Sequence, residues 1–137
     1  MATIYEQTVV NADCELVWAA VSDVGAVHER LLPGYVLDTS MDGDVRFLTM
    51  PSGAVVRELI VTVDDAARRM AYSAVEGFSL PVRHHHASFQ VFPESEGRAR
   101  LVWITDVLPH DVVEEVRPRI RRGLEVMRES IEKQANR

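Results

Sequence analysis

The chain has 137 residues, a length that suits one domain with a substantial buried core, so we expect a single domain over residues 1–137. Hydrophobic residues make up 47% of it and charged residues 26%, a balance typical of a folded globular protein. The formal net charge of -6 argues against nucleic acid or an anionic membrane surface as a partner, because both require a basic face.

The cysteine content and the N-terminal residues bear on location. Cys14 is the one cysteine, which excludes an intrachain disulfide and suits a reducing compartment. The first residues lack the basic start and apolar run of a signal peptide, and no apolar stretch approaches the roughly 18 residues that span a bilayer. We therefore expect a cytoplasmic protein with no integral membrane association.

The first third of the chain predicts one strand and two short helices. Residues 3–10 are rich in Thr, Ile, Tyr and Val, which favours a strand. Asn11 to Asp13 then provides N-cap chemistry, and apolar residues follow at helical spacing up to about Gly25. A second short helix is predicted from about residue 27 to residue 32, where Pro33-Gly34 ends it.

The middle of the chain predicts an antiparallel meander. Short turns rich in Gly, Pro and Asp separate successive apolar or alternating segments, which is typical of consecutive antiparallel strands. The predicted strands cover residues 35–40, 45–50, 54–63, 68–75, 82–92 and 98–108.

The closing segment predicts a long amphipathic helix. Six apolar residues recur every three or four positions from Val113 to Ile131, with charged residues on most other faces. Pro118 is unfavourable inside a helix but costs little in a first turn, so we expect the main helix to begin near Arg117. Only this helix is long enough to cover the apolar face of the sheet, and an apolar cavity between the two is the natural consequence.

The order of elements and several local phrases resemble the helix-grip superfamily. The phrases are Ala12 to Trp18 after the first strand, Arg57-Glu58-Leu59 running into Val63-Asp64-Asp65, Arg69 to Ser73, Trp103, Pro109 and Gly123-Leu124. This superfamily, also called SRPBCC or START-like, includes polyketide cyclase/dehydrase-like proteins, lipid-transfer domains, birch-pollen allergens and plant abscisic acid receptors. The chain looks most similar to the small bacterial cyclase/dehydrase-like group.

The resemblance implies an α+β helix-grip fold: a curved antiparallel sheet of about seven strands around a long C-terminal helix, with two short helices after the first strand. It is specific for fold and weak for activity, because the same scaffold carries binding proteins, transporters and enzymes. The gate phrase Gly-Leu-Pro-Ala of the plant receptors is absent, although Phe78 to Pro81 lies in a neighbouring loop. No basic cluster marks the middle strands.

Glu58 is the first candidate for chemistry. Strand alternation puts it on one face with Val56 and Ile60, and the resemblance implies that this face points inward. A buried Glu58 would have a raised pKa and could act as a general acid or base. The alternative is a solvent-facing Glu58 paired with a cross-strand Arg, since the face that carries Leu59 is the more apolar one.

The run His84-His85-His86 is the second candidate. His85 alternates onto one face with Ala87 and Phe89, and the resemblance implies that it occupies the position of a pocket tyrosine. There it could donate to a ligand carbonyl or transfer a proton near neutral pH. Alternatively the run has no function. A metal site through His84 and His86 lacks a third ligand, so we expect no metal and no other cofactor.

The remaining candidates have ordinary explanations. Tyr72 and Trp103 suit core packing with a polar tip, and Asp106 fits either a buried pocket group or a strand edge. No nearby constellation of His, Asn or Asp supports Cys14 as a nucleophile. The run of arginines between Arg117 and Arg122 suits a solvated helix face or, alternatively, a partner interface.

Three functions follow as hypotheses. The first is binding of a small hydrophobic or aromatic metabolite or lipid by a monomer or homodimer. The second is a cofactor-free cyclase or dehydratase with Glu58 and His85 as acid and base, pointing into one cavity. The third is a chaperone-, ribosome- or quinone-associated interaction module. The predicted ligand-binding residues are Leu31, Tyr35, Phe47, Met50, Ile60, Tyr72, Phe89, Trp103, Asp106, Ile120, Leu124 and Met127.

Overall fold

The computed structural model describes residues 2–136 and contains one antiparallel sheet crossed by a long helix. The strands are β1 (Ala2–Val10), β2 (Asp38–Asp42), β3 (Val45–Thr49), β4 (Val55–Asp64), β5 (Arg69–Glu76), β6 (His84–Ser95) and β7 (Arg98–Leu108). The helices are α1 (Cys14–Ser22), the π-helix η1 (Val27–Leu31), the 3₁₀ helix η2 (His110–Val112) and α2 (Val113–Ala135).

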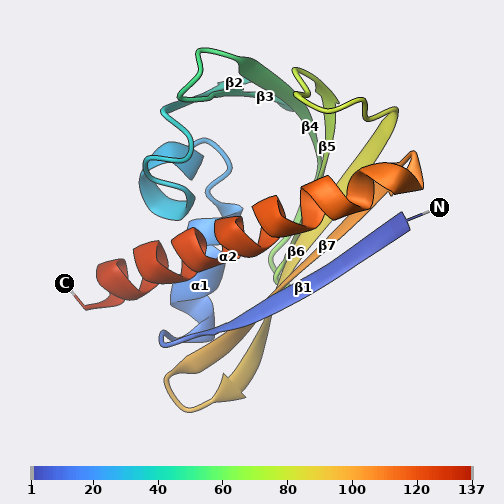
Figure 1. The fold of residues 1–137 in the computed structure, drawn as a ribbon. Helices are drawn as coiled ribbons and strands as arrows, with labels where there is room; N and C mark the ends of the chain where they lie inside the picture. Colours follow the sequence, from blue (N-terminus) through green and yellow to red (C-terminus); the bar gives the residue numbers. More distant parts are fainter. Residues whose placement is uncertain (1, 137) are drawn as a thin grey trace.

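The strand order in the sheet is β1-β7-β6-β5-β4-β3-β2. Adjacent strands are therefore consecutive in sequence, except for the pair β1 and β7. Figure 1 shows the sheet curving around α2, with β1 alongside this helix. Helices α1 and η1 lie toward the C-terminal end of α2. The predicted helix-grip fold is confirmed. The sheet does not close into a barrel, because β1 and β2 form its two edges.

The main core lies between the concave face of the sheet, α1 and the C-terminal half of α2. Ile131, Met127 and Leu124 of α2 are almost completely buried there, as the helical spacing predicts. Trp18 of α1 packs into the same cluster and donates from Nε1 to Asp65 Oδ1 over 2.9 Å, which ties the helix to the turn after β4.

Helix α2 begins at Val113, four residues before the predicted start near Arg117, and that prediction is wrong. Pro118 lies inside the helix, where the missing N–H leaves the Glu114 carbonyl without its usual partner. The apolar stripe explains why the helix continues through this position. Val112 and Ile120, on either side of Pro118, are both buried in a second apolar cluster beneath the helix.

The predicted strand over residues 35–40 is displaced, because β2 begins only at Asp38. The backbone N–H groups of Tyr35 and Val36 both donate to the Leu32 carbonyl, so these two residues turn tightly after η1. This turn brings the apolar residues after Pro33-Gly34 over the end of the cavity described below. Leu37 then joins the sheet through its N–H to the Thr49 carbonyl.

Candidate ligand-binding site

An apolar cavity of about 440 Å³ lies between the concave face of the sheet and α2. Its walls come from η1 and the turn after it, from β3 to β7, and from the middle of α2. Apolar and aromatic side chains make up most of its lining, which is typical of a small-molecule site. The charged residues in the lining are Arg46, Glu58 and Arg119.

Glu58 points inward from β4, and it is paired with a cross-strand arginine as well. Arg46 lies directly opposite on β3, and its Nε and Nη2 both donate to Glu58 Oε1 over 2.9 Å and 2.6 Å. Both side chains are more than nine-tenths buried, with 6% of Arg46 and 8% of Glu58 exposed. Glu58 therefore faces inward and the solvent-facing alternative is wrong, although the cross-strand arginine of that alternative is present.

The remaining contacts of Arg46 hold it in place at the cavity wall. Its Nη1 donates to the Val24 carbonyl over 3.3 Å, which links β3 to the segment between α1 and η1. Its Cζ lies 5.3 Å from the ring centroid of Tyr72, within the range of a cation–π interaction. Burial raises the pKa of Glu58, and the Arg46 charge and hydrogen bonds oppose that rise.

Tyr72, Phe89 and Trp103 form an aromatic wall along β5, β6 and β7. The rings of Tyr72 and Phe89 stack with centroids 6.0 Å apart, and those of Phe89 and Trp103 lie 4.6 Å apart. Burial and the nearby Glu58 charge raise the pKa of the Tyr72 hydroxyl, which therefore keeps its proton. The neighbouring Trp103 indole N–H opposes that rise, and within residues 2–136 no acceptor reaches it in hydrogen-bond geometry.

Gly123 of α2 allows the helix to approach this wall. A Cβ at position 123 would lie 3.0 Å from Cζ3 of Trp103, closer than most real contacts of this kind. The close approach seats the benzo edge of the indole against the helix backbone. Trp103 therefore spans the interior from the sheet to α2 and forms one boundary of the cavity.

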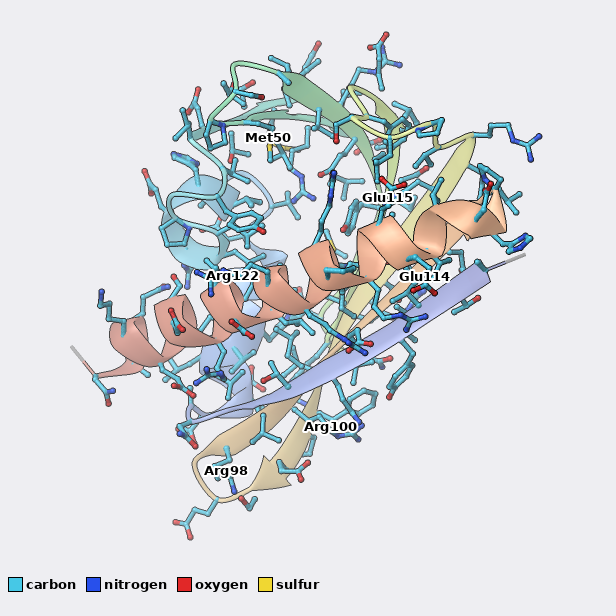
Figure 2. All side chains as sticks on the ribbon, in the orientation of Figure 1. Met50, Arg98, Arg100, Glu114, Glu115 and Arg122 are labelled. Atoms are coloured by element: carbon cyan, nitrogen blue, oxygen red, sulfur yellow. The ribbon has the colours of Figure 1, made fainter. Side chains whose placement is uncertain are left out.

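A second cavity of about 520 Å³ adjoins the first and shares Met50, Val56 and Arg119 with it. Figure 2 shows the Met50 side chain in the space between the β2–β3 hairpin and α2. Arg119 reaches across from α2 and donates to Ser79 Oγ over 2.8 Å, joining the helix to the β5–β6 loop. These residues separate the two cavities.

His85 lines the second cavity and not the first, although it shares the concave face with Glu58. Its Nδ1 accepts the Ala74 backbone N–H over 3.0 Å, just past Tyr72–Ala87, the last pair in the register of β5 with β6. Burial, with smaller effects from His86 and His84, lowers the pKa of His85 to about 4. The ring is therefore neutral at pH 7 and presents only the Nε2–H, a donor.

Eight of the twelve predicted ligand-binding residues line the first cavity. Phe47 does not, because it lies on the opposite face of β3 from Arg46 and Leu48. Asp106 is likewise on the opposite face of β7 from Trp103 and accepts a hydrogen bond from Thr3. Ile60 and Leu124 pack in the core without reaching the cavity. The eight are Leu31, Tyr35, Met50, Tyr72, Phe89, Trp103, Ile120 and Met127.

Sequence reasoning missed the polar partner of Glu58 and several wall residues. Arg46 alternates with Leu48 in the predicted strand 45–50, and pairing that strand with Glu58 in an antiparallel hairpin would have placed both facing inward. The other lining residues that were not predicted are Val21, Val27, Leu32, Val36, Leu48, Val56, Met70, Arg119 and Gly123.

Two further sequence features have a plain structural explanation. The arginines at the start of α2 contact the chain itself: Arg121 donates to Glu6 over 2.9 Å, and Arg117 lies 3.7 Å from the same carboxylate. Within residues 2–136, no three His, Cys, Asp or Glu side chains are grouped closely enough to hold a metal ion. Over the same range, no helix is both long enough and apolar enough to cross a membrane.

Comparison with solved structures supports the fold. An uncharacterised protein from Bacillus thuringiensis is 19% identical with a TM-score of 0.85, covering 95% of this chain and 98% of that one. Norcoclaurine synthase from Thalictrum flavum is 26% identical with a TM-score of 0.74, covering 97% and 85%. BexL, a di-domain aromatase/cyclase from the BE-7585A biosynthetic pathway, is 17% identical with a TM-score of 0.83, covering 96% and 47%.

Comparison at the level of sequence gives the family. No curated protein matches this sequence. Residues 1–132 match the family described as polyketide cyclase / dehydrase and lipid transport, which is nearly the whole chain. The chain belongs to this family of polyketide cyclase, dehydrase and lipid-transport proteins.

Proposed function

We propose that the protein binds a small hydrophobic or aromatic molecule in the cavity between the sheet and α2. The observation that carries the proposal is the cavity itself: about 440 Å³, lined mainly by apolar and aromatic side chains, with one buried ion pair. A core of this kind ordinarily packs to a density that leaves few voids larger than a water molecule. An apolar space this large is costly unless a ligand fills it.

The family and the neighbouring structures support a ligand-binding or cyclase role. Norcoclaurine synthase has been solved in complex with dopamine and hydroxybenzaldehyde, so this fold accommodates aromatic molecules in that protein. The aromatic wall of Tyr72, Phe89 and Trp103 provides surfaces against which a planar ring can stack in this one.

Two neighbouring residues of β3 provide a matched test of the cavity. Leu48 lines it, whereas Phe47 is on the opposite face of the strand. We expect Leu48→Trp to fold, because the larger ring can enter the cavity, and to lose the binding of naphthalene-sized aromatic compounds measured by calorimetry. Phe47→Trp should bind as the unaltered protein does. Equal affinities in the two variants would show that the ligand binds elsewhere.

Native mass spectrometry of freshly purified protein provides the second test. We expect a co-purifying small molecule with one-to-one stoichiometry in the unaltered protein and in Phe47→Trp, and none in Leu48→Trp. A bound molecule in all three would contradict the assignment to this cavity. No bound molecule in any of them, together with no affinity for aromatic or lipid compounds, would contradict ligand binding altogether.

A cofactor-free cyclase or dehydratase is the second candidate, and the burial of Glu58 favours it. A buried carboxyl with a raised pKa in a ligand cavity is a common arrangement for a general acid or base. Glu58 would take a proton from the carbon next to a ligand carbonyl and return it to the leaving hydroxyl. His85 fits the role of a donor better than that of a base, since the ring nitrogen that carries its lone pair, Nδ1, already accepts the Ala74 N–H.

The catalytic proposal is tested by Glu58→Gln, which keeps the shape and removes the proton exchange. We expect this variant to retain ligand binding and to lose at least about a hundredfold in the rate of turnover of a bound polyketone, a typical general acid–base contribution. Unchanged turnover would remove Glu58 from the mechanism. Binding without turnover in the unaltered protein would leave the carrier function alone.

A further inference from the structure

The Tyr72 side chain brings a hydroxyl, a hydrogen-bond donor, to the wall of the first cavity. Only 6% of Tyr72 is exposed, and the residue lines the first cavity. Phe89 stacks against its ring and the Arg46 guanidinium lies over it, so the ring is held in one orientation. Among the described residues, the polar group next to the hydroxyl oxygen is the Trp103 N–H, itself a donor, so the hydroxyl proton is left for an acceptor on the ligand.

The surroundings of Tyr72 contain more donors than acceptors. Within residues 2–136, the Trp103 N–H of this wall is buried without a hydrogen-bond partner. Arg46 directs Nε and Nη2 to Oε1 of Glu58 and Nη1 to the Val24 carbonyl, so Oε2 is the oxygen of Glu58 to which Arg46 does not donate. Most of the polar groups beside Tyr72 are therefore donors, which favour a ligand that carries acceptors.

The charges around the cavity act in the same direction. The lining contains two arginines and one carboxylate, and that carboxylate is paired with Arg46. Glu58 is the one acidic residue in the lining, and the charge of Arg46 offsets its charge. A ligand that carries an ammonium group would enter an apolar space next to positive charge, losing its hydration without gaining a counter-ion.

We propose that the Tyr72 hydroxyl donates to an oxygen acceptor of the ligand, so that the cavity selects neutral carbonyl- or phenol-bearing aromatic molecules over aromatic amines. This inference rests on the proposed ligand-binding function and specifies the chemistry of the ligand. Tyr72 is a specificity-determining residue in this account.

Three naphthalene derivatives of nearly equal shape test the selection by calorimetry. They are 2-acetylnaphthalene, with a carbonyl, 2-isopropenylnaphthalene, with a methylene in its place, and 1-(2-naphthyl)ethylamine, which is protonated at pH 7. We expect the ketone to bind at least about tenfold more tightly than the amine. Tyr72→Phe should weaken the ketone about three- to tenfold, the contribution of one net hydrogen bond, and leave the alkene within about twofold.

Tyr5→Phe is the matched control, because Tyr5 is half-exposed on β1 and lines neither cavity. It should change neither affinity by more than about twofold, and thermal unfolding should show that both variants are folded. An equal loss of ketone binding in the two variants would overturn the role of Tyr72, as would an amine that binds as tightly as the ketone. If none of the three compounds binds, the proposed function fails; if the alkene binds and the ketone gains nothing from Tyr72, only this inference fails.

Discussion

Arg46→Met tests the buried ion pair that defines the polar end of the cavity. The substitution keeps the aliphatic length of the side chain and leaves the Glu58 carboxyl buried without its counter-charge. Breaking a buried pair from one side costs about 3–5 kcal/mol of folding free energy, because the remaining charge is desolvated and unpaired. We expect a loss of that size in urea unfolding at pH 7, followed by circular dichroism.

The same variant has a predictable dependence on pH. Burial already raises the pKa of Glu58, and removal of the Arg46 charge raises it further. A group whose pKa is higher in the folded state stabilises the fold below its unfolded pKa of 4.5, and that contribution is lost as the pH rises. The loss in Arg46→Met should therefore be smallest near pH 4 and grow toward pH 8.

An exposed ion pair in the same region serves as the control. Arg57 is the neighbour of Glu58 on β4, and its Nη1 lies 3.6 Å from Oε2 of Glu76 on β5. Both of these side chains are exposed to solvent. Arg57→Met should cost less than about 1 kcal/mol. The double variant Arg46→Met/Glu58→Leu should recover most of the stability lost in Arg46→Met, because apolar replacements of a buried pair are often neutral or stabilising. An Arg46→Met loss no larger than that of Arg57→Met would refute the burial of the pair.

Three further predictions concern stability. Burial lowers the pKa of His85 to about 4, so the neutral ring contributes its full folding stability above pH 6.5, and this contribution is lost as the pH falls toward 4. The variant His85→Gln cannot take up this proton and should therefore lose up to about 3 kcal/mol less stability than the unaltered protein between pH 6.5 and pH 4. Urea unfolding at the two pH values measures the difference. Gly123→Ala should destabilise by about 1–3 kcal/mol despite the better helix propensity of Ala, because its Cβ would meet Trp103; a gain in melting temperature would contradict this. Pro118→Ala should raise stability by about 1–3 kcal/mol by restoring the N–H donor to the Glu114 carbonyl, and no change in urea midpoint would mean that the proline is fully accommodated.

The fold could be predicted because its elements have strong periodic signals. The apolar stripe from Val113 to Ile131 predicted the long helix, and the short turns predicted the meander. The start of α2 was mispredicted because Pro118 was weighed by local propensity. The burial of Val112 and Ile120 on either side of it overrides that cost.

The candidate site could be predicted only in part, because a cavity depends on which faces of several strands converge. Alternation alone could not orient β3, and Phe47 was placed inside when Arg46 and Leu48 are the inward pair. The inward position of Arg46 follows from its register with Glu58, a long-range fact. The hydrogen bond of Ala74 to His85 Nδ1 arises where the pairing of β5 and β6 ends, which no local pattern encodes.

The two tryptophans allow a direct test of the claim that a ligand occupies the cavity beneath α2. Trp103 lines the cavity, whereas Trp18 is buried outside it and is bonded to Asp65. In protein labelled with fluorotryptophan, titration with 2-isopropenylnaphthalene should shift the fluorine NMR signal of Trp103 saturably and leave that of Trp18 in place, with Trp18→Phe used to assign the signals. A Trp103 signal that does not move while calorimetry detects binding, or the absence of any binding, would contradict the claim.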